Sequence, residues 1–357
     1  MTLSQLTLHN FRNYPELRLN AAPGFMVFSG ANGAGKTNIL EAVSMLAPGR
    51  GLRRAALRDI AYQHGPGDFA VAAQLDDVHL GSGTSVETPE RRKTRINEAM
   101  VPTNDLAEWL SILWLTPAMD RLFTEGASGR RNFLDRLVTA LEPAHAGNCA
   151  RYEAARRERN RLLADGYQAD KDWMDGLDVQ LARFGSLVAE ARSRVVVALN
   201  EGLQQSDGSI FATPHLHLAD DQLHTEEQLH QMLRQSRSAD RAAGRTTRGP
   251  HRTDLKVFHA AKRQPAEKCS TGEQKALLFS IILAHADLIA ERRTGRPILL
   301  LDEVAAHLDP QRRAALFDKL AKRGGQVWLT GTEPDLFVDI PQNALHFEVS
   351  DGTVTPR

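Results

Sequence analysis

Apolar residues recur with a period of two near the N-terminus of this 357-residue chain. Over residues 3–20 leucines alternate with polar side chains, which predicts a β-hairpin. A short apolar run at residues 25–29 precedes a glycine-rich loop, and apolar residues at helical spacing follow over residues 39–46. The order strand, loop, helix is therefore predicted. Residues 69–101 contain further strand-like runs separated by turn-like stretches.

The pattern becomes helical between residues 118 and 245, where glycine is rarer and long charged segments carry apolar residues three and four positions apart. An apolar strand is predicted next at residues 298–301, followed by a helix and another strand near residues 326–329. The α/β pattern thus resumes after a helical insertion. We predict an ATPase-like head formed by residues 1–117 and 246–357, with an inserted helical lobe at residues 118–245.

Residues 30–37, GANGAGKT, match the phosphate-binding pattern G-x-x-x-x-G-K-[ST]. The glycines let backbone N–H groups curl around the β- and γ-phosphates, and the N-terminus of the following helix adds positive potential. Lys36 supplies a charge to the phosphates, and the hydroxyl of Thr37 is placed to bind Mg²⁺. A chance glycine loop is the alternative, which the preceding strand and the following helix disfavour.

The apolar strand at residues 298–301 ends in two carboxylates. Asp302 would hold Mg²⁺, directly or through water, and Glu303 would polarise the attacking water as a general base. Alone, this pattern also fits a core strand with a polar end. The phosphate-binding loop far upstream favours the catalytic interpretation, with Glu303 and Lys36 as the catalytic residues.

Residues 269–275, CSTGEQK, place Ser270 and Gly272 at the start of another predicted helix. A helix that begins in this way offers a second anion-binding terminus. Read alone, the same residues describe an ordinary N-capped helix. Their position between the loop and the carboxylate strand favours a phosphate-sensing interpretation.

In chain order, the loop, the helix at Ser270, the carboxylate strand and the turn at residues 306–309 resemble the head of an ABC-type ATPase. Residues 10–13, NFRN, and the helical insertion are similar to heads that act on DNA, as in structural-maintenance-of-chromosomes proteins. The shortness of the insertion and three further motifs resemble the bacterial RecF family of recombination and repair proteins. These motifs are residues 49–53 (GRGLR), 130–135 (RRNFLD) and 249–255 (GPHRTDL).

The resemblance implies an α/β fold, an ABC-type P-loop ATPase head whose mixed sheet has an N-terminal antiparallel part, plus a helical arm. It implies binding of ATP and Mg²⁺, an ATP-dependent homodimer, and binding to DNA, single-stranded and duplex, with a preference for gapped or junction substrates. It also implies work with RecR and RecO to help load RecA. Weak, DNA-stimulated ATP hydrolysis would drive release from DNA.

Several site residues follow from the same resemblance. The expected nucleotide-binding residues are Gly30, Ala31, Asn32, Gly33, Ala34, Gly35, Lys36, Thr37, Asn38 and Arg12. The others are Thr37 and Asp302 for the metal, Ser270, Gly272 and Lys275 for the signature motif that faces the partner's nucleotide, and Asp309 in the D-loop.

The chain departs from the usual ABC-type pattern in three places. Cys269 and Glu273 replace the leucine and glutamine of the signature motif, and a carboxylate at residue 273 is expected to weaken the ATP-bound dimer by like-charge repulsion. Residues 115–120 occupy the expected place of the loop that couples the helical lobe to Mg²⁺, without a clear glutamine. Residues 330–332, TGT, lack the switch histidine of transporters. Slow hydrolysis is therefore expected.

Arginines recur three and four residues apart after residue 233, so they would share one helix face. A phosphate-contacting stripe is one interpretation, and a solvated or ion-paired face is the other. A less regular group at residues 151–161 has the same two interpretations. His251 could be catalytic, although a structural turn near the nucleotide fits its motif better. The proposed stripe consists of Arg234, Arg237, Arg241, Arg245 and Arg248.

Composition narrows the function further. Hydrophobic residues make up 42% and charged residues 25%, which is ordinary for a soluble globular protein. The 44 basic and 44 acidic residues cancel, which argues against a globally cationic nucleic-acid binder but not against a local basic face. The N-terminus lacks the pattern of a secretory signal, no apolar run reaches the ~20 residues that span a bilayer, and a cytoplasmic location without membrane contact is expected.

The remaining features bear on alternative functions. Cys149 and Cys269 lie far apart without metal-ligand spacing, which predicts buried or idle thiols. The NFRN strand, the helical insertion and the missing switch histidine disfavour a transporter ATPase subunit. A nuclease is disfavoured because the sequence has no acidic metal cluster beyond Asp302 and Glu303.

Overall fold

The computed structural model describes residues 2–164, 171–205, 211–219 and 225–357. The chain forms two compact units. The first contains Met1–Asp120, Gly208–Phe211 and Ile282–Arg357, and the second contains Arg121–Asp207 and Ala212–Ile281.

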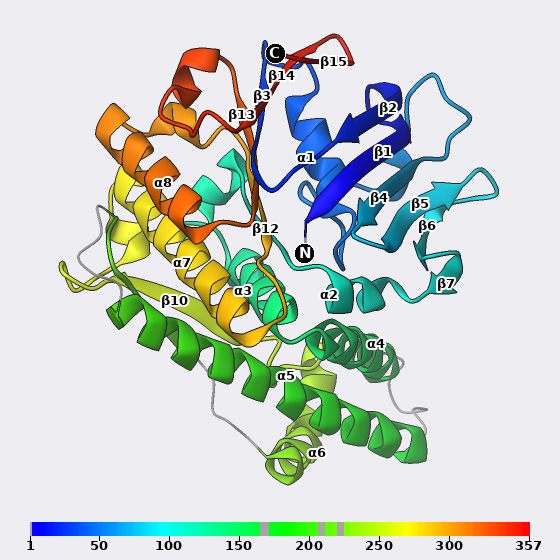
Figure 1. Cartoon of the computed structure of the whole chain (residues 1–357). Coiled ribbons are helices and arrows are strands. Elements are labelled where there is room, and N and C mark those ends of the chain that lie inside the picture. Colours follow the sequence, from blue (N-terminus) through cyan, green and yellow to red (C-terminus); the bar gives the residue numbers. More distant parts are fainter. Residues whose placement is uncertain (1, 165–170, 206–210, 220–224) are drawn as a thin grey trace. The chain divides into compact units, whose positions relative to one another are not determined.

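The first unit contains a six-stranded antiparallel sheet with the strand order β2-β1-β4-β5-β6-β7 (Figure 1). The predicted hairpin is present, with Leu6 opposite Leu19 and Leu8 opposite Leu17. These leucines are buried on one face of the sheet, as the alternation predicts. The strands are β1 Leu3–Phe11, β2 Tyr14–Asn20, β4 Ala70–Leu75, β5 Val78–Ser85, β6 Thr88–Ile96 and β7 Ala99–Val101.

A second sheet of the first unit has the order β15-β14-β3-β13-β12-β8 and is parallel except for the β14–β15 pair. It joins strands from both ends of the chain. Because β3 and β12 both pair with β13, the strands that precede the glycine-rich loop and the two carboxylates lie one strand apart. The strands are β3 Gly24–Ser29, β8 Ile112–Leu115, β12 Ile298–Leu301, β13 Gln326–Gly331, β14 Leu345–Ser350 and β15 Thr353–Pro356.

The strands of this sheet are continuous apolar runs in the sequence because they are buried in the core. Every residue of β12 and β13 is buried, as expected for parallel strands covered on both faces. Phe28 on β3 stacks between Trp328 and Phe347, with ring centroids 5.5 and 5.2 Å away. The helices of this unit are α1 Lys36–Ser44, α2 Leu106–Trp109, α8 Pro310–Arg323 and the C-terminal part of α7 Thr271–Arg292.

The second unit holds the helical insertion, and the helical pattern expected there is present as α3 to α6 (Figure 1). The helix α6 begins with a capping box between Thr225 and Gln228 and ends at Gly244, which adopts a left-handed conformation. A three-stranded sheet of order β11-β10-β9 completes the unit. The elements are α3 Ala127–Leu141, α4 Ala144–Ala164, α5 Lys171–Gln205, α6 Glu226–Ala243, β9 Pro214–Ala219, β10 Asp254–His259 and β11 Gln264–Pro265.

The compact units divide the chain at points that differ from the predicted domain boundaries. The sequence interpretation assigns residues 246–357 to the head, whereas the second unit continues to Ile281. The reason is strand pairing: β10 pairs along its whole length with β9 inside the insertion. Among the described residues, no helix combines the length and the apolar character needed to cross a membrane.

Candidate nucleotide-binding site

The glycine-rich loop connects β3 to α1 in the first unit (Figure 1). Gly35 immediately precedes α1 with φ +114°, a conformation that favours glycine. A Cβ atom at this position would lie 2.4 Å from Nδ2 of Asn13 and 2.7 Å from the hydroxyl of Tyr14. A larger residue is therefore excluded both by backbone conformation and by space.

Two residues at the turn of the N-terminal hairpin hold this loop. Asn13 donates from Nδ2 to the carbonyl of Ala34 at 3.1 Å, and the hydroxyl of Tyr14 donates to the carbonyl of Gly35 at 3.1 Å. Burial raises the pKa of Tyr14, so its hydroxyl remains a proton donor at neutral pH. Asn38, an expected nucleotide-binding residue, donates to Oδ1 of Asn13 at 2.7 Å. The β1–β2 turn and α1 thus fix the loop from two sides.

Lys36 is buried at the start of α1 and turns back over the loop. Its Nζ atom donates to the carbonyls of Gly30 at 2.8 Å and Ala31 at 3.0 Å, and lies 3.4 Å from Oε1 of Glu303. The predicted catalytic pair Lys36 and Glu303 is thus brought together. A phosphate bound in the loop would contact this ammonium group, because the Lys36 side chain already lies across the loop backbone.

Thr37 and Asp302 also meet, across 265 residues of sequence. The Thr37 hydroxyl donates to Oδ1 of Asp302 at 2.7 Å. A hydroxyl and a carboxylate beside a phosphate loop are the oxygen ligands that suit Mg²⁺. These two side chains therefore fit a magnesium ion, and the metal site stays a prediction.

Glu303 adopts a left-handed backbone conformation with φ +53°. This conformation is uncommon for a residue with a Cβ atom and stores local strain. Its backbone N–H donates to Oγ1 of Thr330 at 2.9 Å, while the N–H of Asp302 donates to the carbonyl of Leu115 at 2.9 Å. The segment at residues 115–120 therefore adjoins the carboxylates through its backbone. The sequence marks Thr330 only as part of the segment that lacks the switch histidine and does not predict this contact.

Arg12, an expected nucleotide-binding residue, makes a two-pronged ion pair with buried Glu41 of α1 at 2.8 and 2.7 Å. It also donates to the carbonyl of Asp59 at 2.6 Å. Arg53, from the motif at residues 49–53, pairs with the same carboxylate at 2.8 Å and reaches Oδ1 of Asn38. The two arginines thus brace α1 from outside the loop. The sequence missed Glu41, because its spacing alone marks it only as a helix residue.

Arg92 of β6 lies at the other end of α1. It donates to the carbonyls of Gly49 at 2.7 Å and Ala47 at 3.1 Å, and also contacts that of Met45. Burial lowers the pKa of Arg92 to about 10, and the guanidinium remains charged at neutral pH. A cation at the C-terminus of a helix complements the helix dipole, whose positive end here lies at the phosphate loop.

The signature residues lie at the start of α7. The Ser270 hydroxyl and backbone N–H both donate to Oε2 of Glu273 at 3.0 Å, and the N–H of Glu273 donates back to Ser270 Oγ at 3.4 Å. This is a capping box, so the N-capped helix expected from the sequence is present. Buried Cys269 precedes it. Asp309 caps another helix, since its side chain accepts from the N–H of Arg312 at 2.9 Å at the start of α8.

The family of the chain follows from comparison with known proteins. A family profile described as RecF/RecN/SMC N terminal domain matches residues 2–354. A curated relative from Mesorhizobium japonicum, DNA replication and repair protein RecF, is 48% identical over 370 aligned residues covering 99% of this chain and 97% of the relative. A protein of the same name from Brucella abortus is 48% identical over 373 aligned residues, covering 99% and 96%. The chain belongs to the RecF family.

Solved structures show the same fold. A structure of the recombination mediator protein RecF-ATP in the RecFOR pathway has a TM-score of 0.86 at 22% identity, with 100% of this chain and 97% of that chain covered. An Smc head domain from Pyrococcus furiosus has a TM-score of 0.56 at 14% identity, covering 100% and 96%. The predicted fold, an ATPase head with a helical insertion, is confirmed.

Two of the motifs behind the RecF resemblance contact each other in the second unit. Arg130 makes a two-pronged, largely buried ion pair with Asp254 at 2.7 and 2.9 Å. Arg131 donates to the carbonyl of Thr253 at 3.1 Å. His251 lies between the hydroxyl of Tyr152 at 2.7 Å and the carbonyl of Thr246 at 3.1 Å. Burial lowers the pKa of His251 to about 4, so the ring is neutral at pH 7 and links these two partners within the second unit.

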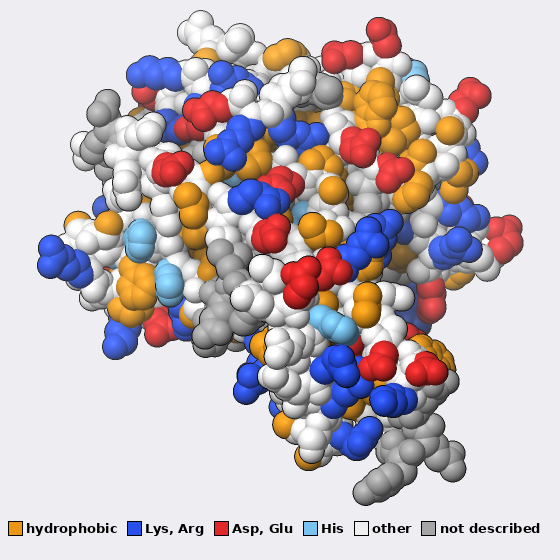
Figure 2. All heavy atoms as spheres, turned by 90° about the horizontal axis from the view of Figure 1, so that it is seen from below, with side chains coloured by type: hydrophobic (Ala, Val, Ile, Leu, Met, Phe, Trp, Pro, Cys, Tyr) orange, Lys and Arg blue, Asp and Glu red, His pale blue; other side chains and the backbone are white. Residues whose placement is uncertain are grey.

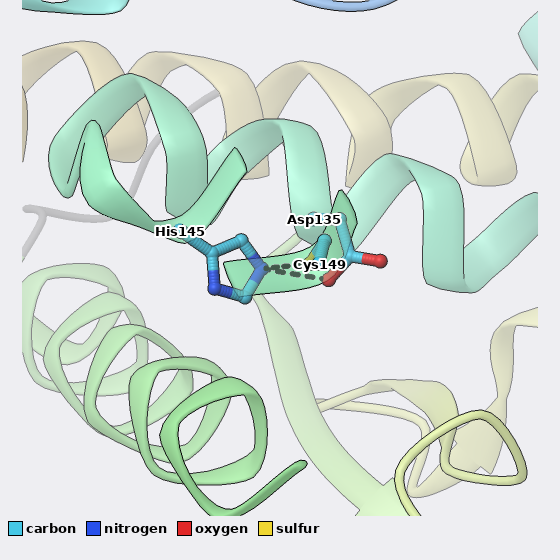
Figure 3. A group of neighbouring side chains, drawn as sticks. All are labelled: Asp135, His145 and Cys149. Atoms are coloured by element: carbon cyan, nitrogen blue, oxygen red, sulfur yellow. Dashed lines mark hydrogen bonds and ion pairs between the residues drawn. The ribbon is translucent and has the colours of Figure 1, made fainter. Parts of the chain in front are cut away.

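Asp135 ends the first of these motifs and lies beside His145 and Cys149, which point toward it in Figure 3. His145 Nε2 is 2.8 Å from Asp135 Oδ1 and 3.3 Å from the sulfur of Cys149. Three ligand types of a transition metal thus meet where the sequence shows only an isolated cysteine. However, buried Arg192 donates to both oxygens of Asp135 at 2.8 Å. A divalent cation would face this guanidinium, so the cluster fits an ion-pair network better than a metal site.

Arg192 extends the network by donating to the carbonyl of Pro250 at 2.6 Å, which links it to the second motif. Burial raises the pKa of the Cys149 thiol, with a further contribution from Asp135. The thiol is therefore protonated and unreactive at neutral pH, as predicted for an idle cysteine.

The predicted arginine stripe is only partly available to a ligand. Arg237 pairs with Asp178 and Asp175 and is half-buried. The helix ends before Gly244, so the last two arginines of the stripe lie beyond it. On the face shown in Figure 2, basic and acidic side chains are interspersed among the described residues. The stripe members that are exposed are Arg234, Arg241, Arg245 and Arg248.

The second arginine group contains a structural residue. Arg159 is fully buried and pairs with Asp178 at 2.6 Å and Asp240 at 2.7 Å. It also donates to the hydroxyl of Thr246 at 3.0 Å. Arg156 pairs with Glu153 on the same helix at 2.7 Å. The ion-paired interpretation therefore holds for these two residues.

Proposed function

We propose that this chain is an ATP-dependent DNA-binding protein of DNA replication and recombinational repair. ATP binding would drive dimerisation on gapped DNA, and slow hydrolysis would drive release. The observation that carries the proposal is the convergence of Thr37, Asp302, Lys36 and Glu303 at one glycine-rich loop. Support for the biological setting comes from relatives at 48% identity that are DNA replication and repair proteins.

The side chains that converge at the loop have distinct roles in this proposal. Lys36 neutralises phosphate charge, and Glu303 orients and deprotonates the attacking water. Mg²⁺ held by Thr37 and Asp302 would supply further positive charge to the phosphates. Arg12 and Asn38 act on the nucleotide less directly, because both are already tied to Glu41 and Asn13.

The signature motif is proposed to act in the dimer, with Ser270, Gly272 and Lys275 facing the nucleotide of the partner subunit. Gly272 supports this assignment. Glycine is less favourable than alanine in a helix, by up to about 1 kcal/mol in the interior, yet a Cβ atom at Gly272 in the first turn of α7 would meet nothing within 4 Å in the described structure. The described residues therefore do not require glycine at this position. Close approach of another molecule to this turn would require glycine there.

Binding to DNA and to RecR and RecO, leading to RecA loading, is proposed from the family relationship. The exposed arginines of the stripe are the candidate phosphate contacts, since phosphate contacts need charge and carry no base information. A weak, DNA-stimulated ATPase in the cytoplasm is consistent with this function.

Two substitutions test the roles at the loop. Lys36→Ala should abolish ATP binding, because it removes the cation from the ground-state phosphates. Glu303→Gln should retain binding and lose turnover, because it affects the attacking water. Fluorescent-nucleotide titration and steady-state phosphate release measure the two quantities separately. An equal loss of ATP affinity in both variants would contradict this division of roles.

A further inference from the structure

The first two hydrogen-bond donors of the signature motif are already engaged within the chain. The hydroxyl and the backbone N–H of Ser270 both donate to a single oxygen, Oε2 of Glu273, at 3.0 Å. These are the groups at the start of α7 that an incoming anion would use. A carboxylate therefore lies where the proposed function requires a phosphate.

The other oxygen of the same carboxylate contacts a lysine from a different element. Lys262 lies in the turn between β10 and β11, and its Nζ atom donates to Oε1 of Glu273. The Lys262 and Glu273 side chains remain 50% and 27% exposed, so the pair has room to move without repacking a core. Ser270 and Lys262 thus hold Glu273 from opposite sides.

Resting on the proposed dimer, we propose that Glu273 is an internal anion that holds the Ser270 donors until a nucleotide phosphate of the partner subunit displaces it, and that Lys262 retains the displaced carboxylate. Two anions cannot share the same two donors without strong repulsion. Lys262 lowers this repulsion by neutralising the carboxylate and by offering it a second partner. The contact between Ser270 and Glu273 is then an autoinhibitory one, which raises the nucleotide concentration needed for dimerisation.

Displacement must occur with the carboxylate ionised. The hydrogen bond from Lys262, followed by those from the backbone and side chain of Ser270, lowers the pKa of Glu273 to about 2. At neutral pH the group therefore cannot leave Ser270 by taking up a proton. Exchange of ionic partners is the remaining route.

The central test compares ATP-dependent dimerisation of the full chain and Glu273→Gln by sedimentation velocity with Mg²⁺ and a slowly hydrolysed ATP analogue. Glutamine retains the shape and an acceptor for the cap, but a hydrogen bond to a neutral acceptor is roughly half as strong. We expect the dimer dissociation constant to fall about 5–10-fold, equivalent to the loss of one modest competing interaction. Nucleotide affinity of the monomer should not change.

A double-mutant cycle tests the part of Lys262. Lys262→Met should weaken dimerisation about 5–10-fold when Glu273 is present, because the carboxylate loses its alternative partner. It should have no effect in the Glu273→Gln background. Glu227→Gln removes the same charge from the first turn of α6 and serves as the matched control, for which no change is expected.

The outcomes separate the inference from the proposed function. If the chain and Glu273→Gln both bind ATP but remain monomeric, the proposed dimer and the inference both fail. If the chain dimerises and Glu273→Gln dimerises no more tightly, the inference alone is overturned. Equal weakening by Lys262→Met in both backgrounds would mean that Lys262 contacts the partner directly, which would overturn its assigned part.

Discussion

The hydroxyl of Thr330 donates to Oδ1 of Asp302 at 2.9 Å and accepts from the backbone N–H of Glu303 at the same distance. Thr330 is fully buried at the end of β13. One hydroxyl group thus fixes both the carboxylate proposed to hold magnesium and the strained peptide that orients the proposed general base. This makes Thr330 a positioning residue for the proposed hydrolysis.

Thr330→Val should reduce ATP turnover about 10–100-fold, a range typical of a misplaced catalytic group. The volume is nearly unchanged, but the part-buried N–H of Glu303 loses its partner at a cost of about 1 kcal/mol in stability. Nucleotide affinity should change little, because Lys36 is untouched. Turnover and affinity measured side by side check this split, with Thr355→Val in exposed β15 as control. Normal turnover in the variant would remove Thr330 from the mechanism.

Gly272→Ala should weaken the ATP-dependent dimer without lowering the stability of the protein. Alanine favours a helix over glycine by up to about 1 kcal/mol, so the melting temperature should rise slightly or stay the same. The added methyl group should weaken the ATP-dependent dimer at least about tenfold, if another molecule approaches this turn as closely as proposed. Gly147→Ala in α4 is the matched control, because a Cβ atom there also meets nothing within 4 Å among the described residues. A stabilised variant with an unchanged dimer would argue against the signature assignment.

Asp135→Asn should destabilise the protein by about 3–5 kcal/mol, because it leaves the buried guanidinium of Arg192 without its counter-ion. Urea unfolding at pH 7 measures this loss. Asp254→Asn offers a comparison, since it breaks a second ion pair of the same unit. A loss below about 1 kcal/mol, typical of an exposed ion pair, would show that the network is not needed for stability.

Asp135 should also affect how the free energy of unfolding changes at acidic pH. Burial raises the pKa of Asp135, but the charge of Arg192 and the hydrogen bond from His145 outweigh it and hold the pKa below the usual value. A depressed folded-state pKa contributes stability above the unfolded-state value of about 3.9. That stability is lost as pH falls below about 4. As the pH falls from about 4 to about 2, the free energy of unfolding of Asp135→Asn should therefore decrease less steeply than that of the unsubstituted chain.

Reversal of charge at Arg241 and Arg245 tests the DNA surface. Each neutralised phosphate contributes about −0.9 to the log–log salt slope on duplex DNA. The double reversal should flatten that slope by roughly one or two per subunit and leave ATP binding intact. Titration of a gapped duplex at several salt concentrations measures it. Arg237 is a poor test residue, because its reversal would also break the pairs with Asp175 and Asp178.

Features encoded in a contiguous stretch of sequence could be predicted. The hairpin follows from alternation, the phosphate loop from eight adjacent residues, and an N-capped helix from the polar residues that begin it at Ser270. These patterns act through backbone conformation and near neighbours, so they need no knowledge of the remaining fold.

Features that depend on strand pairing could not be predicted. Thr330 reaches Asp302 because β13 pairs with β12 in one particular register, and Arg92 reaches the end of α1 from a different sheet. For the same reason the second compact unit extends past residue 246, since β10 pairs with β9. Helical spacing likewise left open whether Arg237 is free or ion-paired, and only its contact with Asp178 of α5 shows that it is paired.

The pairing of β3 with β13 has a consequence for how the protein is made. These strands are joined in register from Gly24↔Gln326 to Ser29↔Gly331, so the strand that carries the phosphate loop has no neighbour on that side until the far end of the chain leaves the ribosome. At ~5–20 residues per second, the roughly 300 intervening residues take on the order of 15–60 s. During that interval the apolar strand β3 lacks β13, the strand with which it pairs. Truncation near the C-terminus should therefore yield an aggregation-prone chain, although the loop sequence itself is intact.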